Sequence, residues 1–96
     1  MIVAFRERGT EDIFNGENTD AARRTCPKTI WRAARRKLDQ LNQAVRLADL
    51  AAPPANRLAL HGDRRGQHSI RINDRYRVCF RWTERGAQEV EITDYH

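Results

Sequence analysis

The stretch from Tyr76 to Trp82 alternates between apolar and mostly basic side chains, and it constrains the fold more than any other part of the sequence. One parity is aromatic or aliphatic, with Tyr76, Val78, Phe80 and Trp82. The other parity is largely basic, with Arg75, Arg77, Cys79 and Arg81. Because successive side chains of a β-strand point to opposite faces of a sheet, the pattern predicts a half-buried strand with one packed face and one cationic face.

The segments on both sides of this strand repeat the alternation. Their apolar members are Ile70, Ile72, Val90 and Ile92, and their polar members are Ser69, Arg71, Asn73, Glu89 and Glu91. The connections at residues 73–74 and 84–86 contain Asn, Asp and Gly, which tolerate positive φ and suit hairpin turns. Three successive strands are therefore predicted to form an antiparallel meander with one charged surface.

A long helix is predicted from about Pro27 to Leu47. Its apolar residues recur every three or four positions, as Ile30, Ala34, Leu38, Leu41 and Val45. A proline suits the first turn of a helix because its missing amide donor would have no partner there. We expect this apolar stripe to lie across the packed face of the meander, and the arginines at 32, 35 and 36 to face solvent or a partner.

Shorter elements complete a single α+β domain over residues 1–96, with N-terminal helices packed on one face of an antiparallel sheet. Residues 2–5 form a β-rich opening, and a helix capped by Thr10 is expected to end at Asn15-Gly16. After Pro53-Pro54 breaks the chain, residues 57–60 read as a short strand that leads into the sheet. Residues 62–66, Gly-Asp-Arg-Arg-Gly, are predicted to form a cationic turn beside it.

The basic residues favour a polyanionic partner. The net charge is +5 with a pI near 10.0, and only Lys28 and Lys37 among the 18 basic residues are lysines. The planar guanidinium of arginine matches phosphate bidentately, although a GC-rich genome would also enrich arginine. Two distant cysteines, Cys26 and Cys79, predict reduced thiols rather than a disulfide scaffold or a metal site, and we expect no cofactor. No apolar run approaches the length of a membrane span, so a cytoplasmic protein is expected.

The polar face of the meander allows two interpretations. It can be an ordinary solvated surface on which opposite charges, such as Arg77 and Glu89, pair across strands. The C-terminal run Asp94-Tyr95-His96 favours the second interpretation, because it places a carboxylate, a phenol and an imidazole next to the arginines. These are groups that transfer protons and bind phosphate.

The sequence resembles the HigB branch of the RelE/ParE toxin superfamily over essentially its whole length. The resemblance is carried by the Gly-Asp-Arg-Arg-Gly turn, by Ser-Ile-Arg-Ile-Asn at 69–73, by Tyr-Arg-Val-Cys-Phe at 76–80 and by the Asp-Tyr-His ending. It implies a ribosome-dependent endoribonuclease that cuts translated mRNA and is neutralised by a HigA-like helix-turn-helix antitoxin, through which the complex binds operator DNA.

The resemblance also implies roles for individual residues in a metal-free attack of a ribose 2′-OH on the adjacent phosphorus. Arg77 would hold the developing anion, His96 and Asp94 would transfer protons, and Tyr95 would stack on a base or bind phosphate. The arginines that would position RNA are Arg64, Arg65, Arg71 and Arg75. Several family members carry a histidine and a lysine just before the Gly-Asp turn, whereas Leu58 and His61 stand there in this chain. A catalytic role for His61 therefore stays open.

Two other functions remain possible at this stage. A non-enzymatic toxin of the ParE kind would bind DNA gyrase, and a basic nucleic-acid-binding module would carry out no reaction. The Asp-Tyr-His ending together with Arg77 argues against the gyrase alternative.

Overall fold

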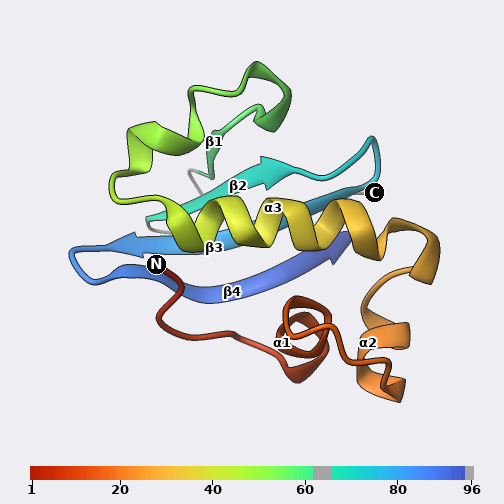
Figure 1. Cartoon of the computed structure of the whole chain (residues 1–96). Coiled ribbons are helices and arrows are strands. Elements are labelled where there is room, and N and C mark those ends of the chain that lie inside the picture. Colours follow the sequence, from red (N-terminus) through yellow and green to blue (C-terminus); the bar gives the residue numbers. More distant parts are fainter. Residues whose placement is uncertain (62–65, 95–96) are drawn as a thin grey trace.

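A four-stranded antiparallel sheet forms the centre of the computed structural model, which describes residues 1–61 and 66–94. The strands are β1 (Ala59–His61), β2 (Gln67–Arg71), β3 (Tyr76–Thr83) and β4 (Gly86–Asp94), in that spatial order. The helices are α1 (Arg8–Phe14), α2 (Asp20–Thr25) and α3 (Trp31–Gln43), with 3₁₀ turns η1 (Lys28–Ile30), η2 (Leu47–Leu50) and η3 (Pro54–Asn56). In Figure 1, α3 runs across one face of the sheet, while α1 and α2 lie beyond the β4 edge. The predicted α+β fold is confirmed.

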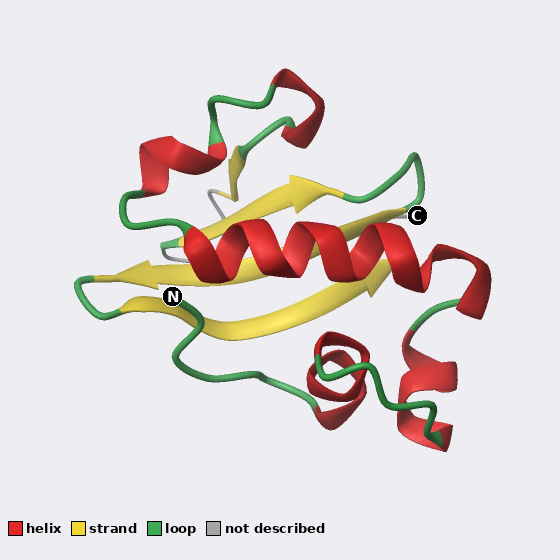
Figure 2. Ribbon diagram, viewed as in Figure 1, coloured by secondary structure: helices red, strands yellow, loops and turns green. Residues whose placement is uncertain are grey.

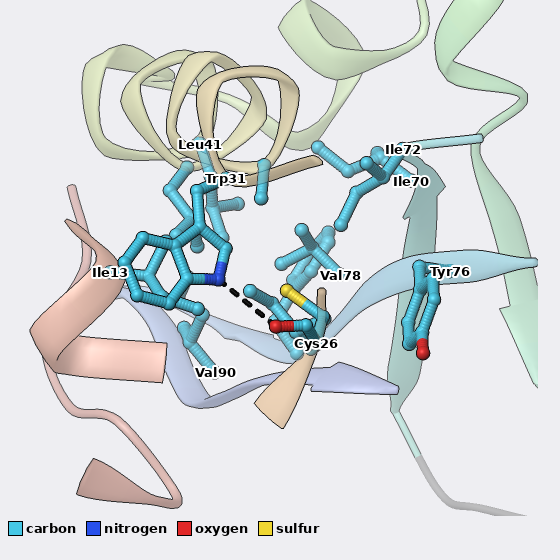
Figure 3. Close-up of a cluster of buried hydrophobic side chains, with 14 of the residues drawn as sticks. Ile13, Cys26, Trp31, Leu41, Ile70, Ile72, Tyr76, Val78 and Val90 are labelled. Carbon is cyan, nitrogen blue, oxygen red and sulfur yellow. Dashed lines mark hydrogen bonds between the residues drawn. The ribbon is translucent and has the colours of Figure 1, made fainter. Parts of the chain in front are cut away.

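The core lies between α3 and the apolar parity of the strands, as the sequence predicts. Its fully buried members include Ile13, Leu38, Leu41, Ile70, Val78, Phe80 and Val90. Each such side chain contributes about 1.5–3 kcal/mol on burial. Trp31 closes the core at the start of α3, where its indole Nε1 donates a hydrogen bond to the Cys26 carbonyl at 3.0 Å (Figure 3). Cys26 and Cys79 are both buried, and they form no disulfide with each other.

The long helix ends earlier than the periodicity predicts. It stops at Gln43, and Val45, predicted to belong to the buried stripe, is 83% exposed. The side chain of Asp49 accounts for this ending, because Oδ2 accepts the backbone N–H groups of Val45 and Arg46, each at 3.0 Å. A carboxylate that accepts these amides caps the next turn, η2, and so competes with continuation of α3.

The N-terminal helices also differ from the prediction. Thr10 is not a helix cap, because α1 begins at Arg8 after Glu7. The Thr10 hydroxyl is instead buried, donating to Glu7 Oε1 at 2.7 Å and accepting the Ile92 amide at 3.0 Å. The polar segment after it, in which the sequence predicts no element, forms α2, with Thr19 as the N-cap residue accepting from Ala22 N at 3.1 Å.

The β-rich opening, residues 2–5, runs alongside β4 but makes only isolated bridges to it and does not form a continuous strand. It makes two parallel bridges, Ile2 with Ala87 and Phe5 with Val90, and thereby covers the outer edge of the sheet (Figure 2). This close approach requires the glycine at 86: its φ is +126°, and a Cβ there would lie 2.2 Å from the Met1 carbonyl oxygen. Within the described ranges, no helix has the length and apolarity needed to span a membrane.

Candidate nucleic-acid interface

The parity that contains Arg77 faces away from α3, and its strand register defines the candidate site. Three rows of register partners run across this surface: Arg71–Arg77–Thr93, then Ala59–Ser69–Cys79–Glu91, then His61–Gln67–Arg81–Gln88. We call this surface the arginine face and number its rows in that order. Because strands rise by about 3.3 Å per residue, the first and third rows are about 13 Å apart along the sheet.

The arginine face is less solvated than its polar composition predicts. Gln67, Ser69 and Cys79 are only 4%, 0% and 3% exposed. Part of this burial comes from Arg77, whose guanidinium lies over Ser69: Nε donates to Ser69 Oγ at 2.6 Å, and Nη2 donates to the Ser69 carbonyl at 3.3 Å. Nη2 also donates to the Arg57 carbonyl at 2.6 Å. These three hydrogen bonds hold Arg77 in one orientation on a largely rigid sheet.

Arg71 and Arg77 stand directly opposite each other in the first row. Two like charges in register on neighbouring strands repel each other, and an anion between them would remove the penalty. Asp74 partly balances this charge, because its exposed carboxylate accepts a hydrogen bond from Arg71. Since such a surface ion pair is worth about 0–1 kcal/mol, a phosphate can compete for Arg71 at little cost.

Asp94 is held by an arginine at the end of β4. Arg75 Nη2 and Nε donate to Asp94 Oδ2 at 2.8 and 3.0 Å, and the Arg75 guanidinium lies 5.6 Å from the centre of the Tyr76 ring. The carboxylate raises the pKa of Arg75 further above its ordinary value. The pair joins a residue predicted for proton transfer to one predicted for RNA binding. The register partner of Asp94 is Tyr76, so Asp94 stands one residue beyond the first row.

The predicted cross-strand pair between Arg77 and Glu89 is wrong. Arg77 is in register with Thr93, and Glu89 pairs instead with Arg81, with 3.3 Å between Arg81 Nη1 and Glu89 Oε2. The cause is a bulge in β4: the register shifts between Cys79 and Arg81, and Glu89 itself has a φ of 52°. The alternation in the sequence contains no signal for such an extra residue.

The other predicted site residues divide into two groups. Arg64, Arg65, Tyr95 and His96 lie outside the described residues. His61 ends β1 with its backbone opposite Gln67 in the third row. By strand rise, that row is about 16 Å along the sheet from Asp94. The register therefore places Arg71 and Arg77 toward one end of the arginine face and the His61 backbone toward the other. Asp94 lies near the first end, but it is in register with Tyr76 and so on the parity opposite to Arg77.

Two polar features of this face were not identified from the sequence. The first is the contact of Ser69 and Arg57 with Arg77, for which the only signal was the parity that Ser69 shares with the arginines. The second is Thr93, whose hydroxyl oxygen is buried and has no hydrogen-bond partner among the described residues. A buried hydroxyl without a partner costs about 1–3 kcal/mol, and it stands beside Arg77 in the first row. Within the same ranges, no three His, Cys, Asp or Glu residues are grouped as metal ligands.

Together, the sheet and its helices define a small α+β domain with one helix-packed face and one arginine-lined face, a fold consistent with RelE-like proteins. The model of the HigB-like toxins, described as RelE-like toxins of type II toxin–antitoxin systems, matches residues 3–96. The chain belongs to this family. It is therefore a toxin of a toxin–antitoxin module, and membership implies an antitoxin partner.

Two individual proteins are similar to this chain, and one of them is named as a HigB toxin. Toxin HigB-1 of Vibrio cholerae is 35% identical over 85 residues, which cover 88% of this chain and 86% of the relative. An uncharacterised protein of Haemophilus influenzae is 33% identical over 57 residues, which cover 58% of this chain and 56% of that protein. The family suggests a toxin of the RNase type.

Proposed function

We propose that this chain is a ribosome-dependent endoribonuclease that cuts mRNA during translation and so inhibits protein synthesis. The observation that carries the proposal is the first row of the arginine face, where Arg77 is held by three hydrogen bonds directly opposite Arg71. Fixed positive charge of this kind stabilises the anionic transition state of phosphoryl chemistry without reorganising during the reaction.

In the proposed reaction, the ribose 2′-oxygen forms a bond to the adjacent phosphorus and the bond from phosphorus to the 5′-oxygen breaks. The 2′-OH gives its proton to a base, and the leaving oxygen receives a proton from an acid, so no redox partner is needed. Arg77 holds the negative charge that develops on the phosphoryl oxygens.

Proton transfer is assigned to the end of the chain. His96 and Asp94 are the proposed acid and base, and Tyr95 would stack on a base or hydrogen-bond the phosphate. His61 is the alternative proton carrier, although its row is about 13 Å along the sheet from that of Arg77. Because the Arg75–Asp94 pair is partly exposed, at 57% and 38% for the two side chains, RNA phosphate can replace the carboxylate at Arg75 and release Asp94.

The remaining assignments concern RNA and protein partners. Arg64, Arg65, Arg71 and Arg75 would contact the phosphates of mRNA or ribosomal RNA, which fixes register without reading sequence. The antitoxin would be a HigA-like helix-turn-helix protein, which carries the complex to operator DNA. The toxin would act in the cytoplasm, where translating ribosomes are.

Induced expression in cells tests this function. Primer extension compares a translated message with the same message lacking a start codon, after induction of the toxin without its antitoxin. We expect cuts only within the translated message. Equal cutting of both messages would remove ribosome dependence, and early loss of DNA synthesis with intact mRNA would favour a gyrase-directed toxin.

A further inference from the structure

We propose that Ser69 and the corner formed by Asn56 and Arg57 are a positioning device that sets the Arg77 guanidinium before RNA binds. The inference rests on the proposed function, in which Arg77 stabilises the transition state. It assigns a role to the connection between η3 and β1, which the resemblance and the sequence patterns leave without one.

The first observation is that Arg77 is oriented from two separate segments. Ser69, in the neighbouring strand, supplies a hydroxyl and a carbonyl, while Arg57, in the connection before β1, supplies a carbonyl. Ser69 is fully buried, so its hydroxyl has one small range of positions. A guanidinium bound along its Nε and Nη2 edge cannot rotate about its long axis without breaking these bonds.

The second observation is the backbone of Arg57. Its φ and ψ are 45° and 53°, a left-handed conformation that costs a non-glycine residue of order 1–2 kcal/mol. This conformation ends η3 and accompanies the 2.6 Å contact between its carbonyl oxygen and Arg77 Nη2. Strain at a residue that contacts a proposed site residue, rather than at a free loop tip, favours a positional role.

The third observation is what holds this strained corner in place. Asn56 is fully buried, and its Nδ2 donates to Gln40 Oε1 at 3.0 Å and to the Leu50 carbonyl at 3.1 Å. Its Oδ1 accepts a 2.5 Å hydrogen bond from Lys37 Nζ. Asn56 is therefore tied to α3 and to η2, and the chain of contacts runs from α3 through Asn56 and Arg57 to Arg77.

Burial of the Lys37 ammonium opposes folding, because a charged group loses its hydration when it is buried. Its side chain belongs to a residue only 7% exposed, and among the described residues Asn56 is its one hydrogen-bond partner. Burial lowers its pKa, and so does the charge of Arg36 and Arg71. Lys37→Met removes this charge but also takes the donor away from the buried Asn56 Oδ1, which costs about 1–3 kcal/mol. Lys37→Met therefore loosens the anchor of Asn56, whereas Ser69→Ala leaves that anchor intact.

We call the hydrogen bonds of Arg77 to Ser69 and Arg57 the clamp, and they can be tested without any assumption about activity. In the purified chain, the Nε–H of Arg77 gives an NMR signal that Arg77→Ala identifies by its loss. We expect slow hydrogen exchange of this signal in the wild type, and exchange at least about tenfold faster in Ser69→Ala and Lys37→Met. Fast exchange in the wild type would overturn the proposal, as would unchanged exchange in both variants.

The functional coupling is tested by a double-mutant cycle on message cleavage in a reconstituted translation reaction. Ser69→Ala should lower the single-turnover rate about tenfold, the effect of one net hydrogen bond. It should have no further effect when Arg77 is already alanine. Thr83→Ala, which removes a hydroxyl that donates to the Gly86 carbonyl at 2.9 Å at the other end of β3, is the matched control and should keep the wild-type rate.

The outcomes separate this inference from the proposed function. Equal effects of Ser69→Ala with and without Arg77 would overturn the positioning role, and so would a wild-type rate in Ser69→Ala and Lys37→Met. If the wild type arrests growth but cuts no message, the nuclease assignment fails, and the same cycle on growth arrest decides whether the clamp acts through Arg77. Melting curves of all variants exclude loss of fold as the cause.

Discussion

Arg77 and Arg81 share a strand and a parity, yet their surroundings are different. Arg77 is half-buried and bound to Ser69 and Arg57, whereas Arg81 is exposed and pairs with Glu89 across the bulge. The alternation in the sequence could not distinguish them. Which arginine is fixed depends on a carbonyl 20 residues away in the chain, at Arg57, and no local pattern contains that information.

We predict that Arg77→Ala removes most of the activity and that Arg81→Ala removes little. Loss of one preorganised donor to a developing anion costs about 2.7–4 kcal/mol, a factor of about 10² to 10³ in rate. The assay is single-turnover message cleavage. Both variants should melt cooperatively, although Arg77→Ala should lose some stability with its hydrogen bonds. Similar rates for the two variants would contradict the assignment.

Thr93 gives a second prediction at the scale of one residue. Thr93→Val keeps the shape of the side chain and removes the buried, unpartnered hydroxyl oxygen, so the free energy of unfolding should stay the same or rise. Because that oxygen is shielded from solvent, and so from RNA, cleavage should keep the wild-type rate. A clear fall in the cleavage rate with an unchanged melting curve would contradict this and show that the hydroxyl takes part in the reaction.

Cys26 makes a prediction about alkaline pH. Burial, with a smaller contribution from the charge of Glu7, raises the pKa of its thiol from 9.0 to about 11. Between these values the unfolded chain has lost the proton and the folded chain has kept it, so stability falls as the pH rises from 9 to about 11. The loss attributable to Cys26 is about 3 kcal/mol at its fullest.

The measurement compares urea unfolding of the wild type and Cys26→Ala at several pH values from 8 to 11. Lys37, whose lowered pKa contributes a slope of opposite sign below 10.5, is present in both proteins and cancels in the difference. The alanine variant should start less stable and lose less with rising pH. Parallel curves would contradict the raised pKa.

At the scale of elements, the strands were predictable and several helix ends were not. The period of 2 located β2, β3 and β4, because one face of each strand must be apolar for the sheet to pack. The end of α3 depends on Asp49, a residue six positions beyond it, and α2 is a short helix whose stability comes from a Thr19 cap and packing on α1. Periodicity describes the faces of an element and does not describe its caps.

The N-terminal segment and β4 make a testable pair of elements. Gly86→Ala would place a methyl group 2.2 Å from the Met1 carbonyl oxygen, which must move and thereby break the pairing of the opening segment with β4. Gly66→Ala is the control for the added carbon, since Gly66 also has a positive φ, +69° against +126° at Gly86, but has nothing within 4 Å of that carbon. We expect a loss of about 1 kcal/mol for the control and several kcal/mol for Gly86→Ala in chemical unfolding. Equal losses would contradict the close approach.

At the scale of the whole molecule, the two faces of the sheet have different surroundings. α3 covers one face of the sheet (Figures 1 and 2), and the core lies between them. The other face carries the arginine rows. The α+β class and the position of Arg77 on the open parity followed from the sequence, because both depend on alternation. The burial of Ser69 and Cys79 in the second row and the Lys37–Asn56 contact did not, because they depend on how α3 and the η3 corner meet the sheet.

The most direct test of the central claim is whether the cut depends on the ribose 2′-OH. The cleavage site is first mapped in a reconstituted translation reaction, and the same message is then synthesised with a single 2′-deoxyribose immediately upstream of the cut. The account predicts that cleavage at that position disappears, while cuts at other codons and the rate of translation before the cut are unchanged. Undiminished cleavage of the 2′-deoxy message at that position would contradict it.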